Sequence, residues 1–326
     1  MTSFAFVFPG QGSQSVGMLD AWGAHPVVQQ VLDEASTALG EDLAVLIHDG
    51  PKEALGLTTN TQPVMLVAGV AAYRVWMAEV GIAPQAVAGH SLGEYAALVA
   101  AKTLTLAQAV PLVRLRAEAM QAAVPVGQGA MAAILGMPVD QVVAHCRAVQ
   151  DGFSPTSGEV VEAVNFNDPN QTVIAGSKAA VEQAMVRIKE AGAKRALPLP
   201  VSAPFHSSLL QPAALRLQEY LGGIELSAPQ LEVINNVDVS ILSGPSAIKE
   251  ALTRQACAPV GWVQTIQLMV EQGVTHIVEC GPGKVLAGMV KRIDSQVRIL
   301  GISSPESITQ VLGELQHQLF ALHRNR

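Results

Sequence analysis

Gly89-His90-Ser91-Leu92-Gly93 is a Gly-x-Ser-x-Gly pattern, and its residue types and spacing suit covalent catalysis. A short apolar run, 86–88, precedes it, and small residues typical of a helix follow at 94–101. This context predicts a sharp strand-to-helix turn that exposes the Ser91 hydroxyl and points the Leu92 amide toward any group bonded to it. The flanking glycines fit because such a turn leaves no room for Cβ atoms. A serine nucleophile is the first hypothesis, and a chance match in a Gly-rich turn is its alternative.

A serine hydroxyl needs a base within hydrogen-bond reach, and His206 is the best placed of the eight histidines. It lies in an irregular segment, 200–207, whose two prolines fix the backbone before a helix begins. A rigid loop over a sheet suits a catalytic base, whereas a surface or capping histidine is the alternative. His90 adjoins Ser91, but neighbouring turn residues usually point apart. Asp168 has the chain order of a triad acid but falls in a turn, and a carbonyl can also orient the imidazole.

Arg116 is the third chemically informative residue. It lies on a predicted helix, 104–123, in line with Leu112, Val113 and Met120 on the apolar side. The side chain of an arginine there either reaches the solvent with its guanidinium group or binds an anion inside the protein. A carboxylate is the best match, because it can accept two parallel hydrogen bonds from the guanidinium. Arg116 is therefore a candidate carboxylate ligand, with the extended surface arginine as the commoner alternative.

The composition describes a globular protein with a large core. Of 326 residues, 49% are hydrophobic and 14% charged, which suits helices packed on a buried sheet. The net charge of −7 argues against nucleic acid as a partner, and no basic run or long apolar span indicates a membrane. Cys146, Cys257 and Cys280 are scattered, so we expect neither a metal site nor a disulfide framework. With no basic leader at the N-terminus, we expect a cytoplasmic protein.

Strands that alternate with helices predict an α/β fold with a largely parallel sheet. The apolar run Phe4–Phe8 predicts a buried strand that enters a Gly-rich loop at 10–14, which fits neither a P-loop nor a dinucleotide fingerprint. Ligands gather at the carboxyl ends of parallel strands, where this loop, Ser91 and the turn at 281–284 would meet. Further strands are expected at 86–89, 231–235 and 276–280, and further helices at 25–39, 61–76, 207–221, 245–255 and 263–272.

Residues 126–198 follow a different order: strand, helix, strand, strand, helix, strand. This is the order of the ferredoxin-like unit, so we expect an inserted small domain hinged near Pro125 and Pro198–Pro200. The large domain would then comprise 1–125 and 199–326. The expected strands are 129–135, 160–165, 171–175 and 193–198, and the expected helices are 138–149 and 178–190.

Six motifs, in this order, resemble those of the bacterial malonyl-CoA:acyl-carrier-protein transacylases. The resemblance runs from Phe4 to about Arg292, and the residues after it carry no motif. The motifs are Pro9-Gly10-Gln11-Gly12-Ser13-Gln14, Gly89-His90-Ser91-Leu92-Gly93-Glu94-Tyr95, Gly129-Ala130-Met131, Pro204-Phe205-His206-Ser207, Asn235-Asn236 and Gly281-Pro282-Gly283-Lys284.

The resemblance implies an α/β-hydrolase-like large domain, with a mostly parallel sheet, and an inserted ferredoxin-like domain. It also implies a transferase that moves malonyl from malonyl-CoA to the phosphopantetheine thiol of acyl carrier protein, supplying fatty acid synthesis. The reaction would be a ping-pong exchange through a malonyl-serine ester. Malonyl-CoA and acyl carrier protein are then the expected partners, and no cofactor is expected.

The resemblance also implies a role for each matching residue. Ser91 would be the nucleophile, with His206 as general base and later general acid. The backbone amides of Gln11 and Leu92 would form the oxyanion hole, and Arg116 would hold the free carboxylate of the malonyl group. Two supporting residues are implied as well: the Gln255 carbonyl would orient the histidine, and Asn236 would line the site.

Three alternatives remain open from the residues alone. A serine esterase or thioesterase would use the same turn with water as second nucleophile, although Arg116 and the missing triad acid argue against it. The transferase subunit of a malonate decarboxylase would share the fold. A non-catalytic module that binds acyl carrier protein would require an inaccessible Ser91.

Overall fold

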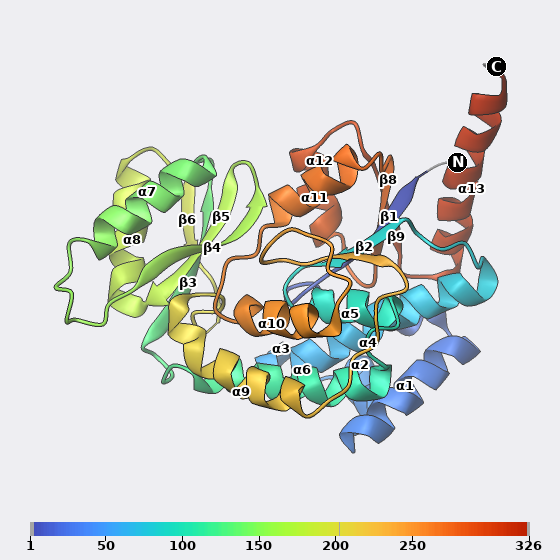
Figure 1. The fold of residues 1–326 in the computed structure, drawn as a ribbon, viewed down its shortest axis with the longest axis horizontal. Helices are drawn as coiled ribbons and strands as arrows, with labels where there is room; N and C mark the ends of the chain where they lie inside the picture. The colour runs from blue at the N-terminus through green and yellow to red at the C-terminus, as the bar shows by residue number, and fades with distance from the viewer. Residues whose placement is uncertain (1–2, 202, 325–326) are drawn as a thin grey trace.

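A parallel five-stranded sheet forms the centre of the large domain (Figure 1). The computed structural model describes residues 3–201 and 203–324, with the side chains of the last helix to residue 316. Every residue of the central strand β1 is buried, because strands flank it on both sides and helices cover both faces. The strand order is β7-β2-β1-β8-β9, with bounds β1 (Phe4–Phe8), β2 (Ala86–Gly89), β7 (Glu232–Ile234), β8 (His276–Cys280) and β9 (Arg298–Ile302).

The alternation of side chains along β1 divides the core into two layers. Phe4, Phe6 and Phe8 face one layer, where Trp76 packs edge-on against Phe6. Helices of this layer are α1 (Pro26–Leu39), α2 (Leu43–Asp49), α3 (Lys52–Gly56), α4 (Thr58–Glu79), α5 (Gly93–Ala100), α6 (Leu106–Ala122), α9 (Gln211–Gly222), α10 (Pro245–Gln255) and α13 (Pro305–Arg324). Ala5 and Val7 face the other layer, where the smaller side chains leave room for α11 (Trp262–Glu271) and α12 (Val285–Ile293). Short 3-10 turns lie at Asp20–Trp22 and Ser208–Leu210.

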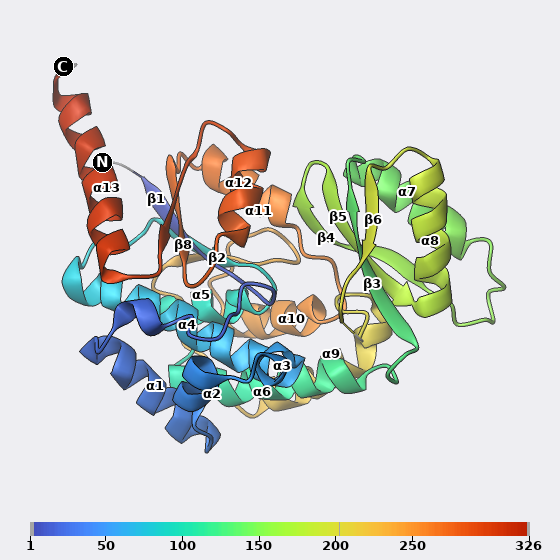
Figure 2. The ribbon, with the colours of Figure 1, turned by 180° about the vertical axis from the view of Figure 1, so that it is seen from behind.

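The inserted small domain is a four-stranded antiparallel sheet with α7 and α8 on one face (Figures 1 and 2). Its strand order, β4-β5-β3-β6, is that of a ferredoxin-like fold, so the predicted fold class is confirmed. Its elements are β3 (Gly129–Leu135), α7 (Val139–Gln150), β4 (Val161–Asp168), β5 (Gln171–Ser177), α8 (Lys178–Glu190) and β6 (Arg195–Pro198).

Backbone hydrogen bonds join the small sheet to the large domain. The amide of Val260 donates to the Val164 carbonyl at 2.8 Å, and the amide of Phe166 donates back to the Val260 carbonyl at 3.0 Å. Arg292 adds an ion pair with Asp168, Nε to Oδ2 at 2.6 Å. The segment just after α10 is therefore bonded directly to β4.

Several elements differ from the expectation. Helix α4 begins at Thr58, three residues before the expected start, because Leu57 is already extended and its carbonyl accepts from the Thr61 hydroxyl. Helix α9 begins at Gln211 rather than Ser207, after a 3-10 turn. The sequence patterns gave no prediction for α2, α3, α12, β9 and α13. Among the described residues, no helix has the length and apolarity needed to cross a membrane.

Candidate active site

Residues 89–93, here called the Ser91 turn, join the buried end of β2 to the start of α5. Ser91 adopts φ +54°, a left-handed conformation that is costly for a residue with a Cβ atom. A Cβ on Gly93 would lie 2.1 Å from the Phe8 carbonyl oxygen, and one on Gly89 would lie 1.8 Å from the Gly93 carbonyl carbon. The two glycines are thus required by close backbone packing, and the turn between them directs the serine hydroxyl into a cavity.

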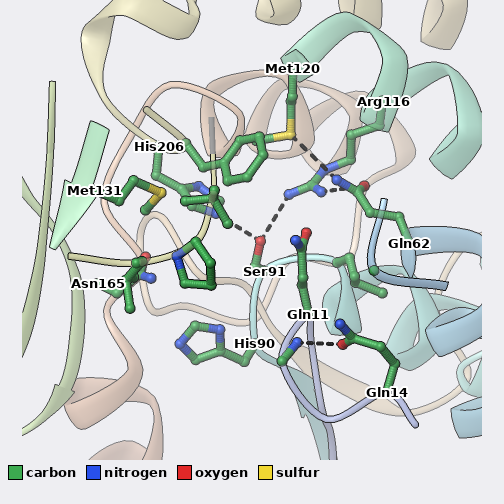
Figure 3. Close-up of a pocket in the computed structure, with 17 residues that line it drawn as sticks. Gln11, Gln14, Gln62, His90, Ser91, Arg116, Met120, Met131, Asn165 and His206 are labelled. Carbon is green, nitrogen blue, oxygen red and sulfur yellow. Dashed lines mark hydrogen bonds between the residues drawn. The ribbon is translucent and has the colours of Figure 1, made fainter. Parts of the chain in front are cut away.

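His206 lies beside the Ser91 hydroxyl, with Nε2 2.7 Å from Oγ (Figure 3). Its Nδ1 lies 2.8 Å from the backbone carbonyl oxygen of Gln255. A carbonyl can only accept, so Nδ1 carries the proton and Nε2 presents a lone pair to the serine. Burial, followed by the nearby Arg116 charge, lowers the pKa of His206 to about 3, so its imidazole is neutral near pH 7.

Asp168, the candidate triad acid, and His90, the other histidine near Ser91, both bind groups outside the Ser91–His206 pair. The carboxylate of Asp168 accepts from Arg292 Nε at 2.6 Å and from the Asn170 amide at 2.9 Å. His90 turns toward the small domain, where its Nε2 lies 2.8 Å from Asn167 Oδ1, and burial lowers its pKa. The imidazole of His206 is therefore oriented by a backbone carbonyl.

Arg116 is 1% exposed and lies at the floor of the cavity rather than at the surface. Its Nη1 donates to Gln62 Oε1 at 2.6 Å, and its Nη2 donates to Ser91 Oγ at 3.1 Å. Nη2 also donates to Gln255 Oε1 at 3.0 Å, and the guanidinium carbon lies 5.4 Å from the Tyr95 ring centroid. These partners are neutral, so the guanidinium can receive a carboxylate without releasing one.

Residues 10–14, here called the Gln11 loop, pack directly against the Ser91 turn. A Cβ on Gly10 would lie 2.6 Å from the His90 carbonyl oxygen, so this contact also requires a glycine. Gln11 and Leu92 both line the cavity around Ser91. In the described part of the chain, neither backbone amide donates to a protein acceptor.

The cavity has a volume of about 480 Å³, within the usual range for small-molecule sites. Both domains contribute walls: Met131 and Asn165 come from the small sheet, and Met120 comes from α6 (Figure 3). The lining combines apolar side chains with a few polar groups that converge on Ser91. Among the described residues, no cluster of three or more His, Cys, Asp or Glu side chains could hold a metal ion.

Asn236 and Gln255 form a hydrogen-bonded support under the Ser91 turn. Asn236 Oδ1 accepts from the Ser91 amide at 2.9 Å, and its Nδ2 donates to the Gly89 carbonyl at 2.7 Å. Gln255 Nε2 donates to the Ser91 carbonyl at 2.9 Å. The structure thus brings both expected supporting residues to the nucleophile pair.

Two buried polar residues of this site were not predicted from the sequence. Gln62 holds Arg116 from α4, and Glu94 on α5 accepts from the Asn236 amide at 3.0 Å and from Gln255 Nε2 at 2.8 Å. Burial raises the pKa of Glu94 to about 7. For Glu94 the available signal was the one charged side chain of α5, a helix whose residues are otherwise apolar apart from the Tyr95 hydroxyl. Gln62 follows four other polar residues at the start of α4, so no such signal marks it.

Comparison with known proteins places this geometry in a family. A model of the acyl transferase domain matches residues 5–324. The malonyl CoA-acyl carrier protein transacylase of Escherichia coli (strain K12) is 50% identical over 313 residues, which are 96% of this chain and 99% of that protein.

Two solved structures are similar over nearly the whole chain. An acyl-carrier-protein S-malonyltransferase from Burkholderia pseudomallei 1710b has a TM-score of 0.93 and 58% identity, covering 96% of this chain and 100% of that one. A malonyl-transacylase in complex with its type II PKS acyl-carrier protein has a TM-score of 0.92 and 48% identity, with the same coverage. The chain therefore belongs to the acyl transferase family, among its malonyl CoA-acyl carrier protein transacylases.

Proposed function

We propose that this protein transfers the malonyl group from malonyl-CoA to the phosphopantetheine thiol of acyl carrier protein, supplying fatty acid synthesis. The observation that carries the proposal is the buried Arg116 guanidinium, hydrogen-bonded to the Ser91 hydroxyl and surrounded by neutral partners. A serine nucleophile beside a buried cation whose hydrogen-bond partners are all neutral suits an acyl group that carries its own carboxylate.

The first half-reaction acylates the enzyme. Ser91 Oγ attacks the thioester carbonyl carbon, and His206 Nε2 takes the hydroxyl proton. The backbone amides of Gln11 and Leu92 donate to the tetrahedral oxyanion, each such donor contributing roughly 3 kcal/mol. The intermediate collapses as the C–S bond breaks, and the coenzyme A thiolate leaves with the proton from His206. The malonyl carboxylate replaces the Ser91 hydroxyl as an acceptor for Arg116.

The second half-reaction reverses these roles. The phosphopantetheine thiol gives its proton to His206, and the thiolate attacks the malonyl-serine carbonyl. The ester C–O bond breaks, Ser91 Oγ takes the proton back from His206, and malonyl-acyl carrier protein leaves. Gln255 and Asn236 support these steps by orienting His206 and the Ser91 turn. Water must stay away from the ester between the two steps, and the apolar side chains of the cavity favour this.

We also propose the domain limits 1–125 with 199–326, and 126–198, because the small sheet spans 129–198. The reaction runs on two side chains, one guanidinium and two backbone amides, so it requires no cofactor. The three cysteines are free thiols, which suits a reducing cytoplasm as the location.

The test compares transfer with hydrolysis. The protein is mixed with malonyl-CoA, with and without purified carrier protein, and both malonyl-carrier protein and free malonate are measured. We expect malonyl-carrier protein to form and malonate release to be slow when the carrier is absent. Rapid malonate release without the carrier would instead indicate a serine hydrolase, and no turnover in either arm would indicate a binding module.

A further inference from the structure

We propose that Glu94 is a positioning residue for malonyl selection: it fixes the side chain of Gln255, which in turn fixes Arg116. Glu94 is 2% exposed, does not line the cavity and has no part in the steps above. The inference rests on the proposed role of Arg116 as the ligand of the malonyl carboxylate.

The orientation of the Gln255 amide carries the argument. Its Oε1 accepts from Arg116 Nη2 at 3.0 Å, while its Nε2 donates to Glu94 Oε2 at 2.8 Å and to the Ser91 carbonyl at 2.9 Å. Rotating the amide by half a turn would set its N–H groups against the guanidinium and its oxygen against three acceptor oxygens, those of Glu94, the Ser91 carbonyl and the Asn236 side chain. Glu94 Oε2, which also accepts from the Asn236 backbone amide, offers Gln255 an acceptor and thus selects the orientation that gives Arg116 an oxygen.

Glu94 also supports the Ser91 turn through a second residue, Asn236. Its Oε2 accepts from the Asn236 amide at 3.0 Å, and the Asn236 side chain holds the amide of Ser91 at 2.9 Å. One carboxylate oxygen therefore holds the backbone of Asn236 and the side chain of Gln255, the two residues that position the serine and the arginine. A buried carboxylate is costly unless it is hydrogen-bonded in this way, and burial raises its pKa to about 7.

The test is the ratio of malonyl to acetyl transfer, because a partly unfolded enzyme loses both activities in proportion. Glu94→Leu removes the acceptor, and we expect the ratio to fall roughly tenfold or more as Arg116 loses its fixed partner. Glu94→Gln can still place an oxygen at the same point, and we expect its ratio to stay within about threefold of the unmodified protein.

Glu279 provides a matched control. It is also a buried glutamate, 1% exposed, and accepts from the amides of Leu286 and Ala287, away from the cavity. Glu279→Leu should leave the malonyl-to-acetyl ratio unchanged, whatever it does to stability.

An unchanged ratio in Glu94→Leu would overturn the inference. If that variant does not fold, as judged by circular dichroism, Glu94→Asp replaces it, because its carboxylate falls one methylene short of Gln255. An unchanged ratio in Glu94→Asp would then overturn the inference equally. Arg116→Ala separates the proposed role of Arg116 from the proposed role of Glu94. If this variant keeps the malonyl preference, Arg116 does not bind the malonyl carboxylate, and the inference about Glu94 is wrong as well. If it loses the preference while the Glu94 variants keep theirs, only the inference fails.

Discussion

At the scale of single residues, the site depends on a buried arginine whose hydrogen-bond partners carry no formal charge. Arg116 contacts Gln62, Ser91 and Gln255, and each supplies a neutral oxygen. An incoming carboxylate would gain a charge-assisted pair with a guanidinium that is buried in the protein. The Arg116 side chain would therefore both select the acyl group and help to position the Ser91 hydroxyl.

Arg116→Ala should lose malonyl transfer but keep acetyl transfer. Removing a charge-assisted, buried contact costs about 3 kcal/mol, so kcat/KM for malonyl-CoA should fall roughly 100-fold. The measurement is acyl transfer from malonyl-CoA and acetyl-CoA in parallel. An equal loss on both substrates would show that Arg116 has a structural role instead.

His206 should make stability fall with acidity. Burial and the Arg116 charge lower its folded-state pKa to about 3, whereas the ordinary value is 6.5. Above pH 6.5 neither state binds the proton, and between 6.5 and 3 only the unfolded chain does, so this histidine lowers the free energy of unfolding as pH falls.

His206→Asn removes this titration, and asparagine tolerates the left-handed backbone at φ +65°. The free energy of unfolding of both proteins should fall from pH 6 to pH 5. The fall should be smaller in the variant, by up to about 1.4 kcal/mol. Urea titrations at the two pH values measure the difference. Parallel losses in both proteins would show that His206 is not held neutral.

The sequence predicted the reacting residues better than the buried residues that hold them in place. Ser91, His206 and Arg116 were predictable because each stands in a pattern with its own chemistry. Gln62 lies 54 residues from Arg116 along the chain, and only folding brings them together. Glu94 was visible in a motif, but its partners come from α10 and from the loop after β7.

At the scale of elements, the geometry of the Ser91 turn depends on β1 lying against α5. The Gly93 Cα faces the Phe8 carbonyl, and Ser91 is left-handed between the two glycines. The backbone of the last β1 residue thus sets how closely α5 begins, and the serine is held by that contact.

Gly93→Ala should therefore destabilise the fold and displace the serine. The added Cβ would lie 2.1 Å from backbone, which cannot rotate away, and overpacking of this kind costs about 1–3 kcal/mol or more. Gly222→Ala is the control, because nothing lies within 4 Å of its Cβ position in α9 and its φ is ordinary. Chemical unfolding and malonyl-enzyme formation are measured for both. If Gly93→Ala behaved like Gly222→Ala, the turn would not be as tightly packed as described.

Some elements were predicted from the sequence together with their bounds, and others were not predicted at all. The bounds of β3, α8, α10 and β8 match their expected ranges. Strand β9 lies at the edge of the sheet and is mostly exposed or half-buried, so its apolar pattern is weaker than that of the fully buried β8, which has the same length. Helices α2 and α3 have seven and five residues, too few for a clear helical repeat.

At the scale of the whole molecule, the cavity lies where the two domains meet over the Ser91 turn, and residues of both domains line it. The backbone pairing of β4 with Val260 fixes the small sheet next to the segment that follows Gln255. The carbonyl of Gln255, where this segment begins, positions His206. Movement between the domains would thus disturb the catalytic pair as well as the cavity wall.

Arg292→Ala should weaken the contact between the two domains, here called the joint, which consists of the β4–Val260 hydrogen bonds and the Arg292–Asp168 ion pair. Asp168 is 3% exposed, so removing its arginine leaves a buried carboxylate and should cost about 1–3 kcal/mol. Hydrogen exchange at the amides of Phe166 and Val260, which bond across the joint, should become faster. Arg298→Ala is the control, because its pair with Glu314 is exposed on both sides and should contribute less than about 1 kcal/mol. Equal exchange at the joint in both variants would contradict this account.

The central claim is that Ser91 carries the malonyl group as an ester, and intact mass spectrometry tests it most directly. After mixing with malonyl-CoA, the unmodified protein should gain the mass of one malonyl group and lose it when carrier protein is added. Ser91→Ala should show no adduct under the same conditions. A malonyl adduct of the same mass on Ser91→Ala would contradict the account, because the nucleophile would then be another residue.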